Sequence, residues 1–284
     1  MQSQLYRKAN ARAKRWAKGF TEKNLNFNFC EQRLKIELFL SKPTESLKNL
    51  DFITFSNSCK ILSIWYAADF LEKFLIAKKD FLYPLKQYML WDSIDPLMYC
   101  YGKKGDIRPV VFSGVYLTVC NLLILGKNEQ ARRLLEYSSP DKINFKSEPV
   151  GSICNYVSKM CNVFLKSESV QHEFPGDLNS QYNSLLQYIT SGIDNKGKIN
   201  EIINDVCEFH LSRNKEFQEF YSDHTAMFPS EIIASLLLLH NETREIMHVE
   251  HPLVKNLLII ITDFGNIGTE ELFAKVEQHL VTLS

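Results

Sequence analysis

The feature that most constrains this chain is the helical spacing of its apolar residues. Between residues 46 and 79, apolar side chains recur every three or four positions, as at Ile61, Trp65, Ala68 and Leu75. A period near 3.6 residues predicts amphipathic α-helices rather than strands. Gly and Pro number only 11 and 9 in 284 residues, which is too few for a protein with many β-turns.

The same spacing predicts further helices along most of the chain. We expect them at 84–101, 109–125, 128–138, 149–166, 177–191, 198–213, 229–242, 252–263 and 269–282. Pro84 and Pro109 suit first helical turns, and Gly126 and Gly192 suit the left-handed position that follows a helix. The expected fold class is therefore all-α, an array of antiparallel helical hairpins with a superhelical or bundle-like arrangement.

The two halves of the chain carry opposite charges, although the whole chain is neutral. Residues 1–166 hold 26 basic and 15 acidic residues, whereas residues 167–284 hold 7 and 18, so the halves carry +11 and −11. We expect a basic helical half and an acidic helical half that pack as one domain. Two interpretations stay open. In the first, the halves pack together so that their charges neutralise each other, or each charged surface simply lies in solvent. In the second, the acidic half binds a basic partner.

The acidic half concentrates carboxylates on one expected helix and the loop after it. The candidate partner-binding residues are Asp205, Glu208, Glu216, Glu219 and Asp223. Unmatched like charge on one helical face costs stability, and a basic partner would relieve that cost. The alternatives are the basic half, or an apolar groove between helices such as one lined by Trp65 and Phe112.

The first twenty residues form a basic segment without an acid. Its bases are Arg7, Lys8, Arg12, Lys14, Arg15 and Lys18, opposite a stripe of Leu5, Ala9, Ala13, Trp16 and Phe20. This pattern predicts a docking helix with a buried Trp16. A mitochondrial presequence or a membrane-surface helix is the alternative, because an acid-poor amphipathic segment suits both. The segment lacks the apolar core of a secretory signal, and the uncharged run 110–125 is too short for a membrane span.

The sequence carries no motif for nucleophilic catalysis, nucleotide binding or metal binding. It has no G-x-S-x-G, P-loop or Rossmann fingerprint. Histidines and acids crowd at His240, Glu242, Glu245, His248, Glu250 and His251, but without the H-E-x-x-H order. His210 and His224 are candidate general bases or hydrogen-bonded structural residues. We expect no catalytic residue, cofactor or metal.

The cysteines indicate a reducing compartment. Their number is seven, and no pair has the C-x-x-C spacing of zinc or redox sites. Most lie in apolar helical runs, where a free cysteine behaves as a small apolar residue. We therefore expect a cytoplasmic protein.

Two stretches resemble the all-helical immunity protein 49 family of bacterial polymorphic toxin systems. The first is the apolar helix that ends at Gly126, followed by a short helix at 128–136 and by Ser139-Pro140. The second is 228–239, with the sequence FPSEIIASLLLL, followed by Ile246 and by His251-Pro252-Leu253-Val254. The chain departs from the family at 240–242, where His-Asn-Glu stands in place of Arg-Gly.

The resemblance implies a cytoplasmic protein that binds one cognate secreted toxin and occludes its active site, with no chemistry of its own. We expect no membrane partner. We also expect no nucleic-acid partner, because the chain is neutral and its second half is acidic; the basic N-terminal segment is the only candidate for one. An acidic face suits a nuclease toxin, because nucleases bind phosphates with basic surfaces. The alternative functions are a helical scaffold or regulator that binds a peptide, and a helical metal-dependent hydrolase.

Overall fold

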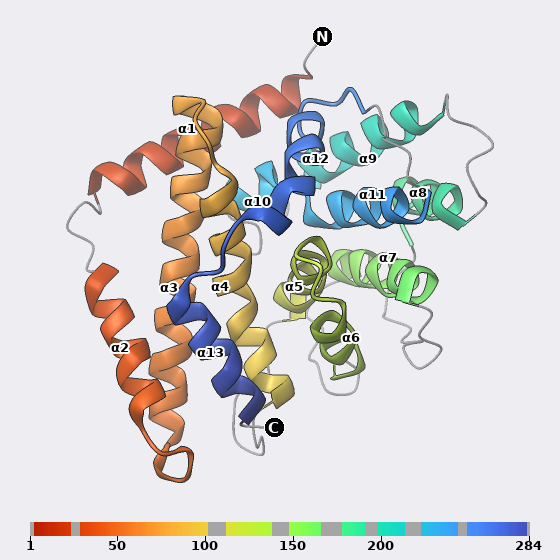
Figure 1. Cartoon of the computed structure of the whole chain (residues 1–284). Helices are drawn as coiled ribbons and strands as arrows, with labels where there is room; N and C mark the ends of the chain where they lie inside the picture. The colour runs from red at the N-terminus through yellow and green to blue at the C-terminus, as the bar shows by residue number, and fades with distance from the viewer. Residues whose placement is uncertain are drawn as a thin grey trace. The chain divides into compact units, whose positions relative to one another are not determined.

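The computed structural model describes residues 3–23, 29–101, 112–137, 148–165, 178–190, 198–213, 223–243 and 249–282. Within these residues the regular secondary structure is entirely helical, which confirms the all-α prediction (Figure 1). None of the described helices combines the length and the hydropathy that a bilayer span requires. An array of hairpins as such stays a prediction.

The chain divides into two compact units. Unit 1 comprises residues 1–13 and 111–262, and unit 2 comprises 14–110 and 263–284. Unit 1 holds 16 basic and 18 acidic residues, a net charge of −2, and unit 2 holds 17 and 15, a net charge of +2. The units therefore do not follow the charge division of the sequence, whose boundary at residue 166 lies outside the described residues.

Unit 2 is built mainly from four long helices. They are α2 (Phe29–Ser41), α3 (Asn49–Leu71), α4 (Leu82–Tyr101) and α13 (Glu271–Thr282), with the short helices η1 (Thr44–Ser46), η2 (Glu72–Ala77) and η3 (Thr262–Asn266). α3 packs between α2 and α4, and α13 contacts both α2 and α4 (Figure 1). Trp91 and Phe273 are buried with perpendicular rings whose centroids lie 5.3 Å apart. They form part of the core between α4 and α13.

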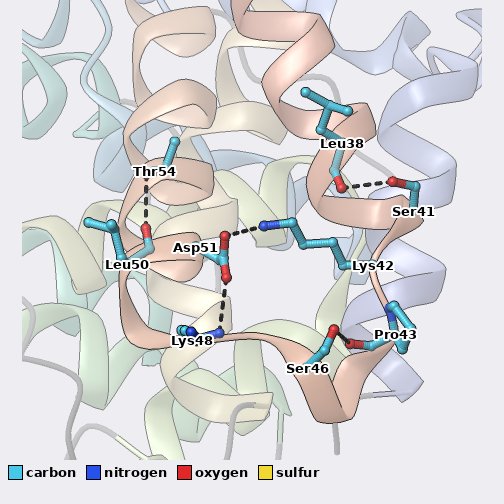
Figure 2. Close-up of polar contacts among 9 residues, drawn as sticks. All are labelled: Leu38, Ser41, Lys42, Pro43, Ser46, Lys48, Leu50, Asp51 and Thr54. Carbon is cyan, nitrogen blue, oxygen red and sulfur yellow. Dashed lines mark hydrogen bonds and ion pairs between the residues drawn. The ribbon is translucent and has the colours of Figure 1, made fainter.

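The turn between α2 and α3 is held by Asp51, the third residue of α3 (Figure 2). Its Oδ2 accepts a hydrogen bond from the backbone N–H of Lys48 at 3.0 Å, and its Oδ1 pairs with the ammonium group of Lys42. The Lys48 side chain offers no acceptor. This contact is therefore the half of a capping box in which the third helical residue reaches back to the N-cap.

Lys86 on α4 fixes the segment that precedes α13. Its ammonium group donates to the carbonyl oxygen of Phe264 at 3.1 Å and to that of Ile267. These carbonyls lie at the end of η3, and that of Phe264 also accepts from the backbone N–H of Ile267 at 3.1 Å. The Lys86 ammonium group is therefore an additional donor at the C-terminal end of η3, where the helix dipole favours a cation.

The structure contains two α-helices that the sequence analysis did not predict, α2 and the short α10 (Asp223–Met227). α2 buries Ile36 and Phe39 but leaves Leu34 and Leu38 about half exposed, at 53% and 54%. Its apolar residues therefore lie on opposite sides of the helix. The single apolar face that a periodicity search detects is absent.

Unit 1 is arranged around α11. Its helices are α5 (Phe112–Ile124), α6 (Asn128–Tyr137), α7 (Glu148–Leu165), α8 (Ser180–Thr190), α9 (Ile199–Arg213), α10, α11 (Ser230–Thr243) and α12 (Lys255–Ile261). α11 contacts α5, α7, α9 and α12. Ile232, Ile233 and Leu236 on α11 have no exposed surface. This helix therefore supplies much of the core of unit 1.

Gly126 ends α5 as its sequence position predicts. Its φ angle is +70°, the left-handed conformation that glycine adopts without a steric penalty. The N–H of Lys127 bonds to the carbonyl of Leu122 at 2.8 Å, and that of Gly126 bonds to Leu123 at 3.0 Å. These two bonds form a Schellman motif. The predicted Gly192 cap and the Ser139-Pro140 stop lie outside the described residues.

The N-terminal helix α1 (Gln4–Lys23) confirms the predicted helix but not the predicted burial of Trp16. Residues 4–13 of α1 belong to unit 1 and residues 14–23 to unit 2. The buried residues are Tyr6, Ala9, Ala13 and Ala17. Trp16 lies at the edge of this stripe, is only partly buried and packs on Phe20 at 5.6 Å between ring centroids.

Candidate functional site

α9 carries the part of the predicted acidic tract that the structure describes. Asp205 is exposed on this helix, and Glu208 is partly buried one turn further on. Glu216 and Glu219 lie outside the described residues. Asp223 is the first residue of α10, and its side chain is not described. The structure thus brings two of the five predicted residues together and does not place the other three carboxylates.

Glu201 and Asp205 form an exposed acidic ridge along one turn of α9. In the described part of the chain, neither carboxylate has an ion pair with a basic side chain. Surface acids on other helices do have such partners one turn away, in the pairs Glu31–Lys35, Asp69–Lys73, Glu129–Arg133 and Glu271–Lys275. The acidic ridge therefore presents negative charge that no described basic side chain pairs with.

Glu208 has a partner inside unit 1. Its Oε1 lies 3.2 Å from Nε2 of His251, and Nδ1 of His251 accepts a hydrogen bond from the backbone N–H of Leu253 at 3.3 Å. Because Nδ1 accepts, we assign the ring proton to Nε2 and the ring as neutral. Burial lowers the pKa of His251, although the Glu208 carboxylate raises it in part. The ring also packs edge-on against Tyr6, with centroids 6.2 Å apart.

The opposite side of α9 contributes His210 to a buried polar cluster. We call it the Glu231 centre, and its members are Tyr182 of α8, His210 of α9 and Glu231 of α11. Oε1 of Glu231 accepts a hydrogen bond from the Tyr182 hydroxyl at 2.7 Å and contacts Nδ1 of His210 at 2.8 Å. Nε2 of His210 lies 3.3 Å from the carbonyl oxygen of Thr225. Both ring nitrogens of His210 therefore face acceptor oxygens.

The Glu231 carboxylate is negatively charged although its side chain has no exposed surface. Burial by itself would raise the pKa of Glu231, but the charge of His210 and the hydrogen bonds from His210 and Tyr182 hold it well below its ordinary value of 4.5. The carboxylate also lies in the first turn of α11, where the helix dipole favours an anion. The centre therefore joins α8, α9 and α11 through an ion pair and a charge-assisted hydrogen bond.

The groups of the Glu231 centre are those of acid–base catalysts, but their bonds are structural. Glu231 and Thr225 engage both nitrogens of His210, so neither nitrogen is left to take a proton from a nucleophile. The Ser235 hydroxyl donates to the Glu231 carbonyl at 2.6 Å and accepts from the Tyr156 hydroxyl at 2.6 Å. These side chains are buried. The geometry therefore supports the interpretation of His210 as a hydrogen-bonded structural residue rather than a general base. The side chain of His224 is not described.

Glu231 was missed in the sequence analysis, although the sequence contains a signal for it. It is the only Asp, Glu, Lys or Arg between Asp223 and Glu242. A single acid at the start of an apolar helix is a candidate for a buried, paired carboxylate. Its partners could not be found in this way, because Tyr182 and His210 lie 49 and 21 residues away in the chain.

The crowded histidines and acids near the end of α11 are dispersed where the structure describes them. His240 is partly buried, Glu250 is exposed and His251 is held by Glu208. The side chains of Glu242, Glu245 and His248 are outside the described residues. Among the residues that are described, no group of three or more His, Cys, Asp or Glu side chains could hold a metal ion.

The alternative groove at Trp65 and Phe112 is also not described. Trp65 is partly buried and packs against Phe29 and Tyr66, with ring centroids 4.8 Å and 5.1 Å apart. The side chain of Phe112 is outside the described residues. Trp65 thus belongs to an aromatic cluster of α2 and α3.

Comparison with protein-family models, curated protein sequences and solved structures gives no match to this chain. The resemblance to the immunity protein 49 family therefore rests on its two sequence stretches alone. The first includes α6, and the second includes the first part of α11.

Proposed function

We propose that this protein is an immunity protein that binds a cognate secreted toxin and blocks its active site. The acidic ridge of Glu201 and Asp205 is the observation that carries the proposal. Two exposed carboxylates without basic partners suit a basic protein surface, because complementary charge raises the association rate and selects the partner. Nuclease toxins have such surfaces for binding phosphates.

Two further observations support binding without chemistry in the cytoplasm. The Glu231 centre uses its acid–base groups in buried structural bonds, so it offers no accessible catalytic pair. All seven cysteines are free thiols, and free thiols suit a reducing compartment.

The test is a binding experiment with the toxin encoded beside the gene for this protein. Isothermal titration calorimetry at about 0.1 M salt is expected to give a one-to-one complex. The double variant Glu201→Lys, Asp205→Lys is expected to weaken binding at least tenfold. The difference should shrink at about 1 M salt, where the Debye length falls from roughly 10 Å to 3 Å.

A control variant changes the net charge by the same amount at exposed positions outside the ridge. Glu45 on η1 and Glu136 on α6 are exposed, and the double variant Glu45→Lys, Glu136→Lys is expected to bind like the parent. If the ridge variant also binds and protects cells like the parent at every salt concentration, the ridge is only a solvated surface. If the neighbouring toxin does not bind the parent protein, the proposed function is wrong.

The second candidate function is a helical scaffold that binds an amphipathic helix of another protein. The observation that favours it is an exposed apolar set on the α2–α3 hairpin, namely Leu34, Leu38, Leu50 and Ile53, of which Leu50 is 72% exposed. Exposed apolar residues spaced three or four apart are typical of helix-docking surfaces. If Leu38→Glu with Leu50→Glu abolishes partner binding while the ridge variant does not, the scaffold function is favoured.

A further inference from the structure

A row of cations lies on the exposed side of α1. The cationic row consists of Arg7, Lys8, Lys14 and Arg15, all exposed, and the exposed Lys18 continues it by one turn. At 3.6 residues per turn these side chains occupy about a third of the helix circumference. The buried stripe of Tyr6, Ala9, Ala13 and Ala17 lies on the opposite side.

The cationic row has no acidic partner among the residues that the structure describes. Residues 3–21 contain no acid, and none of the four cations has an ion pair in the described part of the chain. On α2, η2, α6 and α13, by contrast, basic side chains pair with an acid one turn away. All four cations lie on one uninterrupted helix, so helix geometry alone sets the spacing from Arg7 to Arg15 at about 12 Å.

We propose that the cationic row binds the phosphate backbone of a double-stranded nucleic acid. A duplex carries one negative charge per roughly 1.7 Å of its axis, so several phosphates can face the row together. The release of condensed counterions drives this binding without any apolar contact. Two of the four cations are arginines, whose planar forks match phosphate oxygens.

The exposed side of α1 lacks what other anionic partners require. Single strands stack their bases on exposed aromatic rings, whereas Tyr6 is buried and Trp16 packs on Phe20. Insertion into a bilayer needs an exposed apolar face, whereas the apolar residues of α1 apart from Ala11 are buried or, at Leu5, Trp16 and Phe20, partly buried. The exposed side of α1 offers a single apolar residue, Ala11, so the charges of the row dominate any contact made there. A duplex backbone is the anionic surface that the row favours, because it presents several phosphates in a line without requiring apolar contact.

This inference replaces the expectation that the protein has no nucleic-acid partner. That expectation rested on the neutral total charge of the chain and on the acidity of its second half. Binding to phosphates depends on the charge within about a Debye length of the contact, roughly 8 Å at physiological ionic strength, and not on the total. The inference is independent of the proposed toxin.

The test uses fluorescence anisotropy with a fluorescein-labelled DNA duplex of about 24 base pairs and arbitrary sequence. We expect binding in the micromolar range at about 50 mM salt, with no preference for sequence. Neutralising four phosphates predicts a loss of affinity of about 10²-fold between about 50 and 200 mM salt. The variant Arg7→Gln, Lys8→Gln, Lys14→Gln, Arg15→Gln is expected to lose at least tenfold in affinity at low salt and most of the salt dependence.

The matched control removes four exposed lysines elsewhere. The variant Lys79→Gln, Lys159→Gln, Lys198→Gln, Lys255→Gln has the same net charge and is expected to bind the duplex like the parent. An equal loss in the control overturns the proposal, because it would show a general charge effect. The proposal is also wrong if the duplex does not bind at low salt, if a single strand of equal length binds more tightly, or if phosphatidylcholine vesicles with about 30% phosphatidylserine bind and the duplex does not.

Discussion

At the scale of single residues, the charge of Glu231 is expected to matter most to the stability of unit 1. Glu231→Gln removes the negative charge that His210 and Tyr182 bind in the core. We expect the free energy of unfolding at pH 7 to fall by about 3–5 kcal/mol, the usual cost of breaking a buried ion pair. Urea unfolding followed by circular dichroism measures this change, and Glu136→Gln on the exposed side of α6 serves as the control.

The contribution of Glu231 to the free energy of unfolding is also expected to depend on pH. The pKa of Glu231 is lower in the folded than in the unfolded protein, so its stabilisation is complete above about pH 4.5 and is lost as the pH falls toward the folded value. The difference in unfolding free energy between parent and Glu231→Gln is therefore expected to shrink as the pH falls below about 4.5. A difference that does not change with pH would show that Glu231 is protonated in the fold.

The two tryptophans of α1 and α4 are expected to differ in their contribution to stability. Trp91 has no exposed surface and packs on Phe273, so Trp91→Ala is expected to cost about 3–5 kcal/mol as a large-to-small core change. Trp16 is partly exposed, so Trp16→Ala is expected to cost clearly less. Urea unfolding of both variants makes the comparison, and equal costs would show that Trp16 is buried in solution.

At the scale of elements, Asp51 controls the start of α3. Asp51→Ala removes the acceptor of the Lys48 N–H and the partner of Lys42 (Figure 2). We expect faster amide hydrogen exchange in residues 49–54, while α4 keeps its protection. The hydrogen bonds from Lys42 and Lys48 lower the pKa of Asp51, so the effect should fade as the pH drops and the carboxyl takes up a proton. Glu45→Ala on η1 should leave the exchange unchanged.

The helices themselves show which elements a sequence can predict. α5 ends at a glycine in the left-handed conformation, a signal contained within a few residues, and its end was predicted correctly. α2 was missed because Leu34 and Leu38 lie opposite Ile36 and Phe39. Such a helix has no amphipathic pattern. Its existence depends on packing against α3 and α13, which the local sequence does not record.

At the scale of the whole molecule, burial is expected to sort the cysteines by reactivity. Cys30 is exposed and Cys100 is of intermediate exposure, whereas Cys59, Cys120, Cys154, Cys161 and Cys207 are buried. Burial raises the pKa of these five thiols, so they hold little of the reactive thiolate. A thiol titration with Ellman's reagent is expected to show fast reaction at Cys30, slower reaction at Cys100 and seven reactive thiols in urea. Fast reaction of further thiols in the native protein would contradict the burial.

The sequence by itself determined the helical class, most helix positions, the end of α5 and the absence of catalytic motifs. Each of these depends on residues within one or two turns of one another, so spacing is enough to reveal it. Only the tertiary structure decided that Tyr182 and His210 meet Glu231, that Glu208 binds His251, and that residues 1–13 fold with 111–262. These contacts join positions 21 or more residues apart, and their partners are chosen by the packing of whole helices, which no local pattern encodes.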